Sequence, residues 1–355
     1  MKIAITTVAA ALFVSIVRAT AASETEATAP VAPRFLSDTG LYSNVAKLEI
    51  DKRNRTFSPQ YPLWSDGATK RRWVRLPEGS QINVADLEKW DLPVGTKFWK
   101  EFSFNGRKVE TRFLWQTRKG NWVFASYTWN EQQTNAQLAS ESGIADIAEI
   151  ADGKRHSIPS VSECRSCHDA GRTETLGFNA LQLSTDRDPN ALHAEPLGAE
   201  MLTLKTLVDE NLITPARPEL VTNPPRIAAA SPATRTALGY LSTNCGSCHN
   251  SEGSIAKLGL DVRLTAGALE CSAAIATTIN KRGHWFVPEA PEESRVVNPG
   301  HPETSALIRR ITSRRAISQM PPIGTVVVDR EAVTLLTSWV QGNAAEIAAR
   351  CAQGS

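Results

Sequence analysis

The sequence predicts an α+β multidomain protein in which an N-terminal antiparallel β domain, sandwich-like or barrel-like, is followed by two α-helical units. Three observations lead to this fold class. Alternating apolar and polar residues, punctuated by tight-turn pairs, run from residue 34 to about residue 127. A Cys-x-x-Cys-His sequence then occurs twice, at residues 164–168 and 245–249. Helix-forming sequence surrounds both motifs, with a Pro-rich break between them at residues 215–230.

The first residues predict a cleaved signal peptide, residues 1–22. Lys2 precedes an apolar stretch at residues 3–17, and the small residues from Ala19 to Ala21 are typical of a cleavage site. The apolar stretch is shorter than the roughly 20 residues of a membrane helix, although an uncleaved anchor is the alternative. A polar spacer, residues 23–33, follows. We therefore expect an exported, periplasmic protein with no membrane span in the mature chain.

Net charge and cysteine content indicate which partners and which covalent links to expect. The formal net charge of the 355 residues is only +2, which gives no reason to expect a nucleic-acid partner. Four of the six cysteines belong to the two motifs. The remaining two, Cys271 and Cys351, predict one disulfide in an oxidising compartment, with two separate thiols as the alternative.

Residues 34–150 predict the Trp-rich β domain. Asn105 and Gly106 form the strongest two-residue hairpin turn in the chain, and Lys119 with Gly120 marks the next turn. Strict alternation in the strand between them predicts a half-buried meander. One face would carry Val109, Thr111, Phe113 and Trp115, and the other Glu110, Arg112 and Gln116. From about residue 130 the sequence turns helical.

Most of the nine tryptophans lie in this β domain. They predict a core of large aromatic side chains, or alternatively a stacking platform for a saccharide or a surface for an electron-transfer partner. No histidine or cysteine precedes His156. A histidine-based copper or zinc site in this part of the chain is therefore excluded.

The two Cys-x-x-Cys-His motifs predict covalent haem attachment. Two thiols separated by two residues reach the two vinyl groups of one haem from a single helical turn, and the adjacent histidine becomes the proximal iron ligand. Cys164, Cys167, Cys245 and Cys248 would tether two haem c groups, with His168 and His249 on the irons. A redox dithiol and half of a zinc site are the competing interpretations.

The second unit, residues 231–355, is helical at both ends. Ser231 is a predicted N-cap with Pro232 as the first helical residue, and Ala237 lies on the same helix face as Cys245. The last helix presents Leu336 and Trp339 together on one side. This arrangement resembles class I c-type cytochromes, whose first and last helices cross over the haem with a small residue facing a bulky pair. The resemblance implies that Met320, in the sequence "QMPPIGT", is the distal ligand; a core residue is the alternative.

The first unit, residues 151–214, departs from this pattern. Pro159 blocks a long preceding helix, and Ser160 with Glu163 predicts a capping box directly before the motif. No Met-Pro sequence follows. His193, in the loop before a helix predicted over residues 197–213, is the first choice of distal ligand for this iron. Met201, His156 and an open or water-bound iron are the alternatives.

The whole chain also resembles a family of exported bacterial proteins with a β-rich front half and c-haem sites behind, through "YPLWSDGATKRRWVRLPEG", "YTWNEQQTNA", "LGFNALQLSTDRDP" and the "MPPIGT" end. That likeness implies haem and export, without a defined reaction. The leading hypothesis is a periplasmic dihaem cytochrome c that relays electrons between a redox partner protein (a dehydrogenase, an oxidase or another cytochrome) and the respiratory chain. The alternatives are a peroxidase-type dihaem oxidoreductase with an open first haem, and a ligand-binding β module with the haems as its redox outlet.

Overall fold

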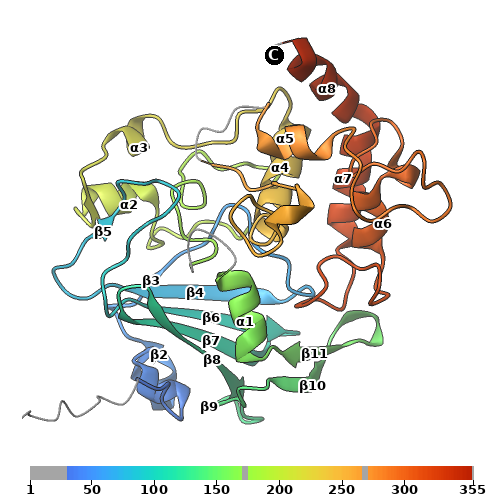
Figure 1. Ribbon diagram of the computed structural model, residues 1–355. Coiled ribbons are helices and arrows are strands. Elements are labelled where there is room, and N and C mark those ends of the chain that lie inside the picture. Colours follow the sequence, from blue (N-terminus) through green and yellow to red (C-terminus); the bar gives the residue numbers. More distant parts are fainter. Residues whose placement is uncertain (1–29, 170–174, 266–270, 354–355) are drawn as a thin grey trace, which may run out of the picture. The chain divides into compact units, whose positions relative to one another are not determined.

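The computed structural model describes residues 30–169, 175–265 and 271–353. The predicted signal peptide and residues 23–29 of the predicted spacer lie outside this part of the chain. In the described residues the fold is α+β, with the strands concentrated in the N-terminal half (Figure 1). No helix in these ranges is both long and apolar enough to cross a membrane.

The strands are β1 (Tyr42–Asn44), β2 (Glu49–Ile50), β3 (Arg55–Thr56), β4 (Thr69–Arg75), β5 (Ile82–Asn83), β6 (Lys97–Phe104), β7 (Arg107–Arg118), β8 (Asn121–Trp129), β9 (Ala136–Leu138), β10 (Ile144–Glu149), β11 (Arg155–Ile158) and β12 (Ile213–Thr214). The helices are α1 (Val161–His168), α2 (Leu204–Asp209), α3 (Glu219–Thr222), α4 (Pro232–Asn244), α5 (Ala273–Thr278), α6 (Ala306–Thr312), α7 (Arg330–Gly342) and α8 (Ala344–Gln353).

A six-stranded antiparallel sheet of order β3-β4-β6-β7-β8-β9 organises the N-terminal half. Asn105 and Gly106 join β6 to β7, and both adopt the positive φ that the predicted hairpin turn requires (49° and 75°). The sheet is open, with β3 and β9 at its edges, so it is not the closed barrel that the sequence left possible. Three two-stranded sheets accompany it: β1-β2, β10-β11 and the parallel pair β5-β12.

The antiparallel meander is confirmed in β6, β7 and β8, but both faces of the sheet are covered, so the prediction that it is half-buried is wrong. On one face Leu36 and Leu41, from the segment before the sheet, pack with Trp99 and Phe113. On the other face Phe98 shares a core with residues 178–220. The charged face predicted to meet water is enclosed by this second layer, because the chain after α1 folds back over the sheet.

A β-bulge changes the predicted pattern of β7. The pairing with β6 shifts between Phe102 and Ser103, so that Val109 is the extra residue on β7. Val109 packs with Phe102 and Phe104, whereas Phe113 lies in the cluster on the other face. The predicted alternation therefore holds only beyond the bulge.

The prediction of helix from about residue 130 is also wrong. This segment forms β9, paired with β8, and β10, paired with β11. Both strands have the polar, weakly apolar composition that made a helix plausible, and backbone pairing with neighbouring strands outweighs that local preference.

The helices of the C-terminal part form a second core. Ala237 and Leu241 of α4 share a cluster with Leu336 and Trp339 of α7, so the two helices pack through the faces that the sequence predicts. Gly239 makes a further close approach possible, because a Cβ there would lie 2.2 Å from the Tyr61 ring. The N-terminal half is thereby packed directly against α4.

The segment between the two cores is shorter in helix than predicted. The helix expected over residues 197–213 is only α2, and Met201 precedes it. The Pro-rich segment at residues 215–230 contains α3, and its Leu220 packs in the core of the sheet while Ile227 packs in the core of α4 and α7. This segment is therefore part of the folded body, where the sequence predicts a linker.

Candidate functional site

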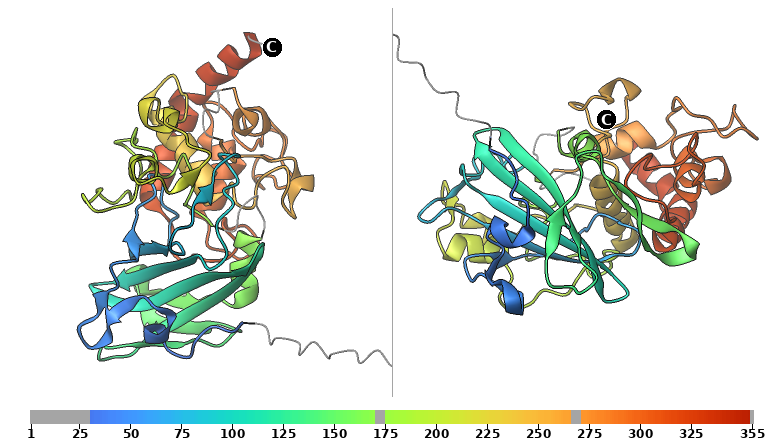
Figure 2. Two further views of the ribbon diagram at one scale, coloured as in Figure 1. Left: turned by 90° about the vertical axis from the view of Figure 1, so that its left-hand side faces the viewer. Right: turned by 90° about the horizontal axis from the view of Figure 1, so that it is seen from below.

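One cavity of about 810 Å³ is lined by all six cysteine and histidine residues of the two motifs. Its volume lies near the upper end of the roughly 300–1,000 Å³ typical of ligand sites. Its wall combines side chains of the sheet, of α1, of α4 and of the loop that carries Met320. In Figure 1, α1 lies across the sheet, below α4 and α5, and the left view of Figure 2 shows the sheet below and the helical part above it. The fold thus brings the two motifs, far apart in sequence, to one place.

The first motif is presented by α1. Ser160 caps this helix by accepting a hydrogen bond from the Glu163 N–H, and the Glu163 carboxylate accepts one from the Ser160 N–H at 2.8 Å, as the predicted capping box requires. Cys164 and Cys167 are three residues apart on this helix and share one face. Both thiols therefore point toward the same wall of the cavity.

The sheet supports this first motif from below. The His168 ring lies 5.2 Å from the Phe124 ring of β8, and the Arg165 guanidinium lies over the same ring. Burial raises the pKa of the Cys164 thiol, and the positive charge of Arg112 on β7 opposes that rise. The first motif therefore faces a wall of the sheet that is both aromatic and charged.

The second motif begins where α4 ends. Cys245 is the C-cap residue of α4, and burial raises the pKa of its thiol to about 12. The next residue is Gly246, and a larger residue would not fit at this position because its Cβ would lie 2.4 Å from the Ser242 carbonyl oxygen. His249 is partly buried, and its Nδ1 is enclosed without a hydrogen-bond partner among the described residues. Burial also lowers the pKa of His249, which favours the neutral imidazole that binds metals.

The two motifs touch each other. The thiols of Cys167 and Cys248 lie close enough to interact, and this interaction lowers the pKa of Cys248 and raises the pKa of Cys167. This contact links the end of α1 to the loop after α4. Groups attached to these two sulfur atoms would consequently be neighbours.

Met320 lies across this cavity in the loop between α6 and α7. Its N–H donates to the Arg310 carbonyl at 3.0 Å, and Arg314 holds the following part of the loop through the Val327 carbonyl at 2.8 Å. Met320 and His249 line the same cavity. The loop is thus held by hydrogen bonds on both sides of the methionine.

The distal candidates of the first motif are not brought to it in the same way. His193 is absent from the described residues that line the cavity; its Nε2 lies 2.8 Å from the Asp329 carboxylate at the N-cap of α7, and its ring packs on Trp64. Met201 is not among the lining residues either. His156 does line the cavity, but its Nε2 lies 3.1 Å from the buried Glu110 carboxylate.

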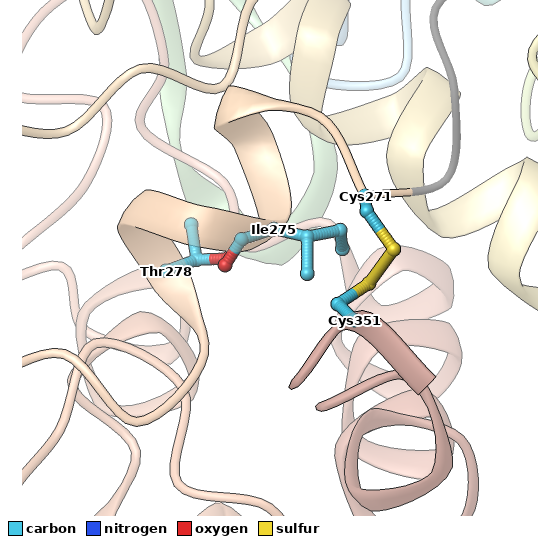
Figure 3. Close-up of a disulfide and its surroundings, with 4 residues drawn as sticks. All are labelled: Cys271, Ile275, Thr278 and Cys351. Carbon is cyan, nitrogen blue, oxygen red and sulfur yellow. A yellow bond between two sulfur atoms is a disulfide. The ribbon is translucent and has the colours of Figure 1, made fainter. Parts of the chain in front are cut away.

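Cys271 and Cys351 are joined by a disulfide, with their Cα atoms 5.4 Å apart (Figure 3). The bond ties α8 to the segment that begins α5. Ile275 of α5 belongs to the core of α4 and α7, and Cys351 packs against that core. The disulfide therefore links the C-terminal helix α8 to a segment that follows the second motif in the sequence.

The sequence patterns did not predict a row of basic side chains that lines the same cavity. Arg72, Lys100 and Arg112 are register partners on β4, β6 and β7, and all three line the cavity. Arg72 pairs with Glu195 at 2.8 Å, and Arg112 pairs with Glu110 at 2.7 Å. The hairpin turn at residues 105–106 predicts that β6 pairs with β7. A register counted from that turn alone ignores the bulge, however, and does not pair Lys100 with Arg112.

The residues of the cavity fit a covalently bound haem group at each motif. Each motif supplies two thiols, and the second supplies a partly buried imidazole, whose pKa is lowered by burial, with Met320 in the same cavity. The cavity wall combines many apolar side chains with charged side chains along the sheet, which suits a macrocycle with an apolar body and carboxylate arms.

Among the described residues, no group of three or more histidine, cysteine, aspartate and glutamate side chains has the arrangement of a metal-ion site. The chain matches no protein-family model, no curated protein and no solved structure.

Proposed function

We propose that this chain is a periplasmic dihaem cytochrome c that transfers electrons between a redox partner and the respiratory chain. The observation that carries the proposal is the single cavity lined by both Cys-x-x-Cys-His motifs. Haem iron supplies reversible one-electron chemistry when bound. The chain would supply four thiols for attachment and two imidazoles as axial ligands, all lining one cavity.

The second motif supports a haem with full axial coordination. His249 and Met320 would be its two ligands, and a thioether ligand raises the reduction potential of haem iron. The packing of α4 on α7 through Ala237, Leu336 and Trp339 supports the proposed class I cytochrome arrangement. A fully coordinated iron favours electron transfer over substrate chemistry.

The contact between the motifs supports electron exchange within the chain. Because Cys167 and Cys248 lie close together in the same cavity, the groups they tether would be neighbours. Two adjacent redox groups in one cavity would form a relay. The periplasmic location and the partner protein are parts of the proposal that rest on the sequence.

Haem counting after production with the c-type maturation machinery tests this proposal. We expect two haems per chain in the wild type and one in each of the variants Cys164→Ala/Cys167→Ala and Cys245→Ala/Cys248→Ala, by pyridine haemochrome spectra and intact mass. The matched control, Cys271→Ser/Cys351→Ser, removes two cysteines and keeps two haems. A wild-type chain without haem, or with bound zinc in its place, would contradict the proposal.

A second possible function is that of a dihaem oxidoreductase with an open first iron. It is favoured by the positions of the three residues predicted as distal ligands of that iron. His193 is bound to Asp329 and His156 to Glu110, and Met201 does not line the cavity. The ferric spin state of the first haem separates the two functions. A low-spin first haem supports the relay, whereas a high-spin first haem that binds cyanide supports the oxidoreductase.

A further inference from the structure

The row formed by Arg72, Lys100 and Arg112 brings three basic side chains together on one wall of the cavity. Two carboxylates, Glu195 and Glu110, face these three cations. Adjacent strands lie about 4.8 Å apart, so the row crosses three strands in about 10 Å. Burying a charge without a partner costs several kcal/mol, so this arrangement implies an anion that the described side chains do not provide.

Two members of the row have donors that no described residue uses. Arg72 is only 6% exposed, and its Nη2 is enclosed without a hydrogen-bond partner among the described residues. The Lys100 ammonium lies 4.9 Å from the Phe102 ring, and within the described ranges it has no carboxylate partner. Burial lowers the pKa of Lys100 well below its ordinary value, and the neighbouring charges of Arg72, Lys70 and Arg112 lower it further.

The position of these donors identifies the chemistry of the anion. Both side chains line the cavity shared with Cys164 and Cys167. A guanidinium and an ammonium side by side favour an oxyanion, and a planar carboxylate fits the guanidinium best. Haem carries two carboxylate arms, so a haem tethered at the first motif would bring the required charge into this cavity by covalent attachment.

We propose that Arg72 and Lys100 form the carboxylate-binding site for a propionate of the haem attached at Cys164 and Cys167. This inference rests on the proposed haem attachment and deepens it. In this arrangement the β domain is the charged wall of the first haem site. Arg112, held by Glu110, fixes the end of the row nearest the two cysteines.

The test measures the midpoint potential and the resonance Raman propionate-bending band of each haem in the full-length holoprotein. Lys100→Met removes a cation, and we expect a negative shift of the first-haem potential together with a shifted propionate band. Lys100→Arg should restore both values. Glu195→Gln removes the opposing charge and should shift the same potential in the positive direction, which keeps the test open if Lys100→Met does not fold.

Lys97→Met is the matched control, because Lys97 lies on the same strand but donates to the Thr39 carbonyl at 2.9 Å. It should move neither quantity. Haem counting on every variant separates the two proposals: two haems with no response to Lys100→Met or Glu195→Gln would overturn this inference alone. A soluble carboxylate is the other source of the anion. If millimolar acetate shifts the wild-type first-haem spectrum and Lys100→Met abolishes that shift, the propionate assignment is wrong.

Discussion

The two Cys-x-x-Cys-His motifs have the same chemistry and different supports. The first ends a short helix in which no residue is buried, and it rests on aromatic and charged side chains of the sheet. The second follows α4, whose buried face packs against α7 in an apolar core. The comparison teaches that the motif specifies only the attachment. The wall behind it sets the ligands, the charge and the accessibility of whatever is attached.

The largest expected difference between the two sites concerns the axial ligand. In the proposed dihaem protein, Met320→Leu should convert the second haem from low to high spin and lower its midpoint potential, because a leucine side chain cannot replace the sulfur ligand. The first haem should keep its spectrum. Electron paramagnetic resonance and spectroelectrochemistry measure both effects.

Met201→Leu is the control for this substitution, since Met201 does not line the cavity. It should leave both haems unchanged. A low-spin second haem in Met320→Leu would show that another residue holds that iron.

The charged support of the first site gives the next largest effect. Burial opposes ionisation of Glu110, but Arg112 and His156 outweigh it and lower the pKa of Glu110 to about 2. A depressed folded-state pKa stabilises the protein above the unfolded value, about 4.3, and this stability is lost as the pH falls toward 2. Glu110→Gln should cost about 3–5 kcal/mol at pH 7, because it leaves the Arg112 guanidinium without its buried carboxylate partner.

Urea unfolding between pH 7 and pH 2 measures this effect. The wild type should lose stability steadily below about pH 4.3, and Glu110→Gln should show a shallower slope over the same range. An unchanged slope would mean that Glu110 is not the group that couples the folding of the first site to protons.

The disulfide tests the support of the second site. It joins residues 80 positions apart, and removing a native disulfide of this kind costs about 2–4 kcal/mol. Cys271→Ser/Cys351→Ser should lower the free energy of unfolding by that amount. Reductant should destabilise the wild type similarly and leave the variant unaffected; a variant as stable as the oxidised wild type would contradict the expectation.

The smallest expected effect comes from His193, which links the two halves. His193→Ala removes the hydrogen bond to Asp329 and should cost about 1–3 kcal/mol of stability. Neither haem spectrum should change. His301→Ala, at an exposed histidine paired with Glu303, should change stability by less than about 0.5 kcal/mol.

A changed first-haem spectrum in His193→Ala would indicate that His193 is the distal ligand of that iron, as the sequence alone suggests. Such a result would require the loop carrying His193 to leave Asp329. The measurement therefore distinguishes a structural histidine from a ligand directly.

Local features of the fold were predictable because they depend on a few neighbouring residues. The turn at Asn105 and Gly106, the capping box of Ser160 and Glu163, and the N-cap at Ser231 need only local hydrogen bonds and allowed backbone angles. The segment after residue 130 was mispredicted for the complementary reason. Its strands exist because other strands lie beside them.

The sequence by itself determined the two motifs, the spacing of their thiols and the faces of α4 and α7, since these depend on helical and hairpin periodicity. Only the tertiary structure decided that both motifs share one cavity and that Arg72 and Lys100 line it. It also decided that His193 bonds to Asp329. These are contacts between distant segments, set by a bulge, by sheet register and by the return of the chain over the sheet, and no local pattern of residues encodes them.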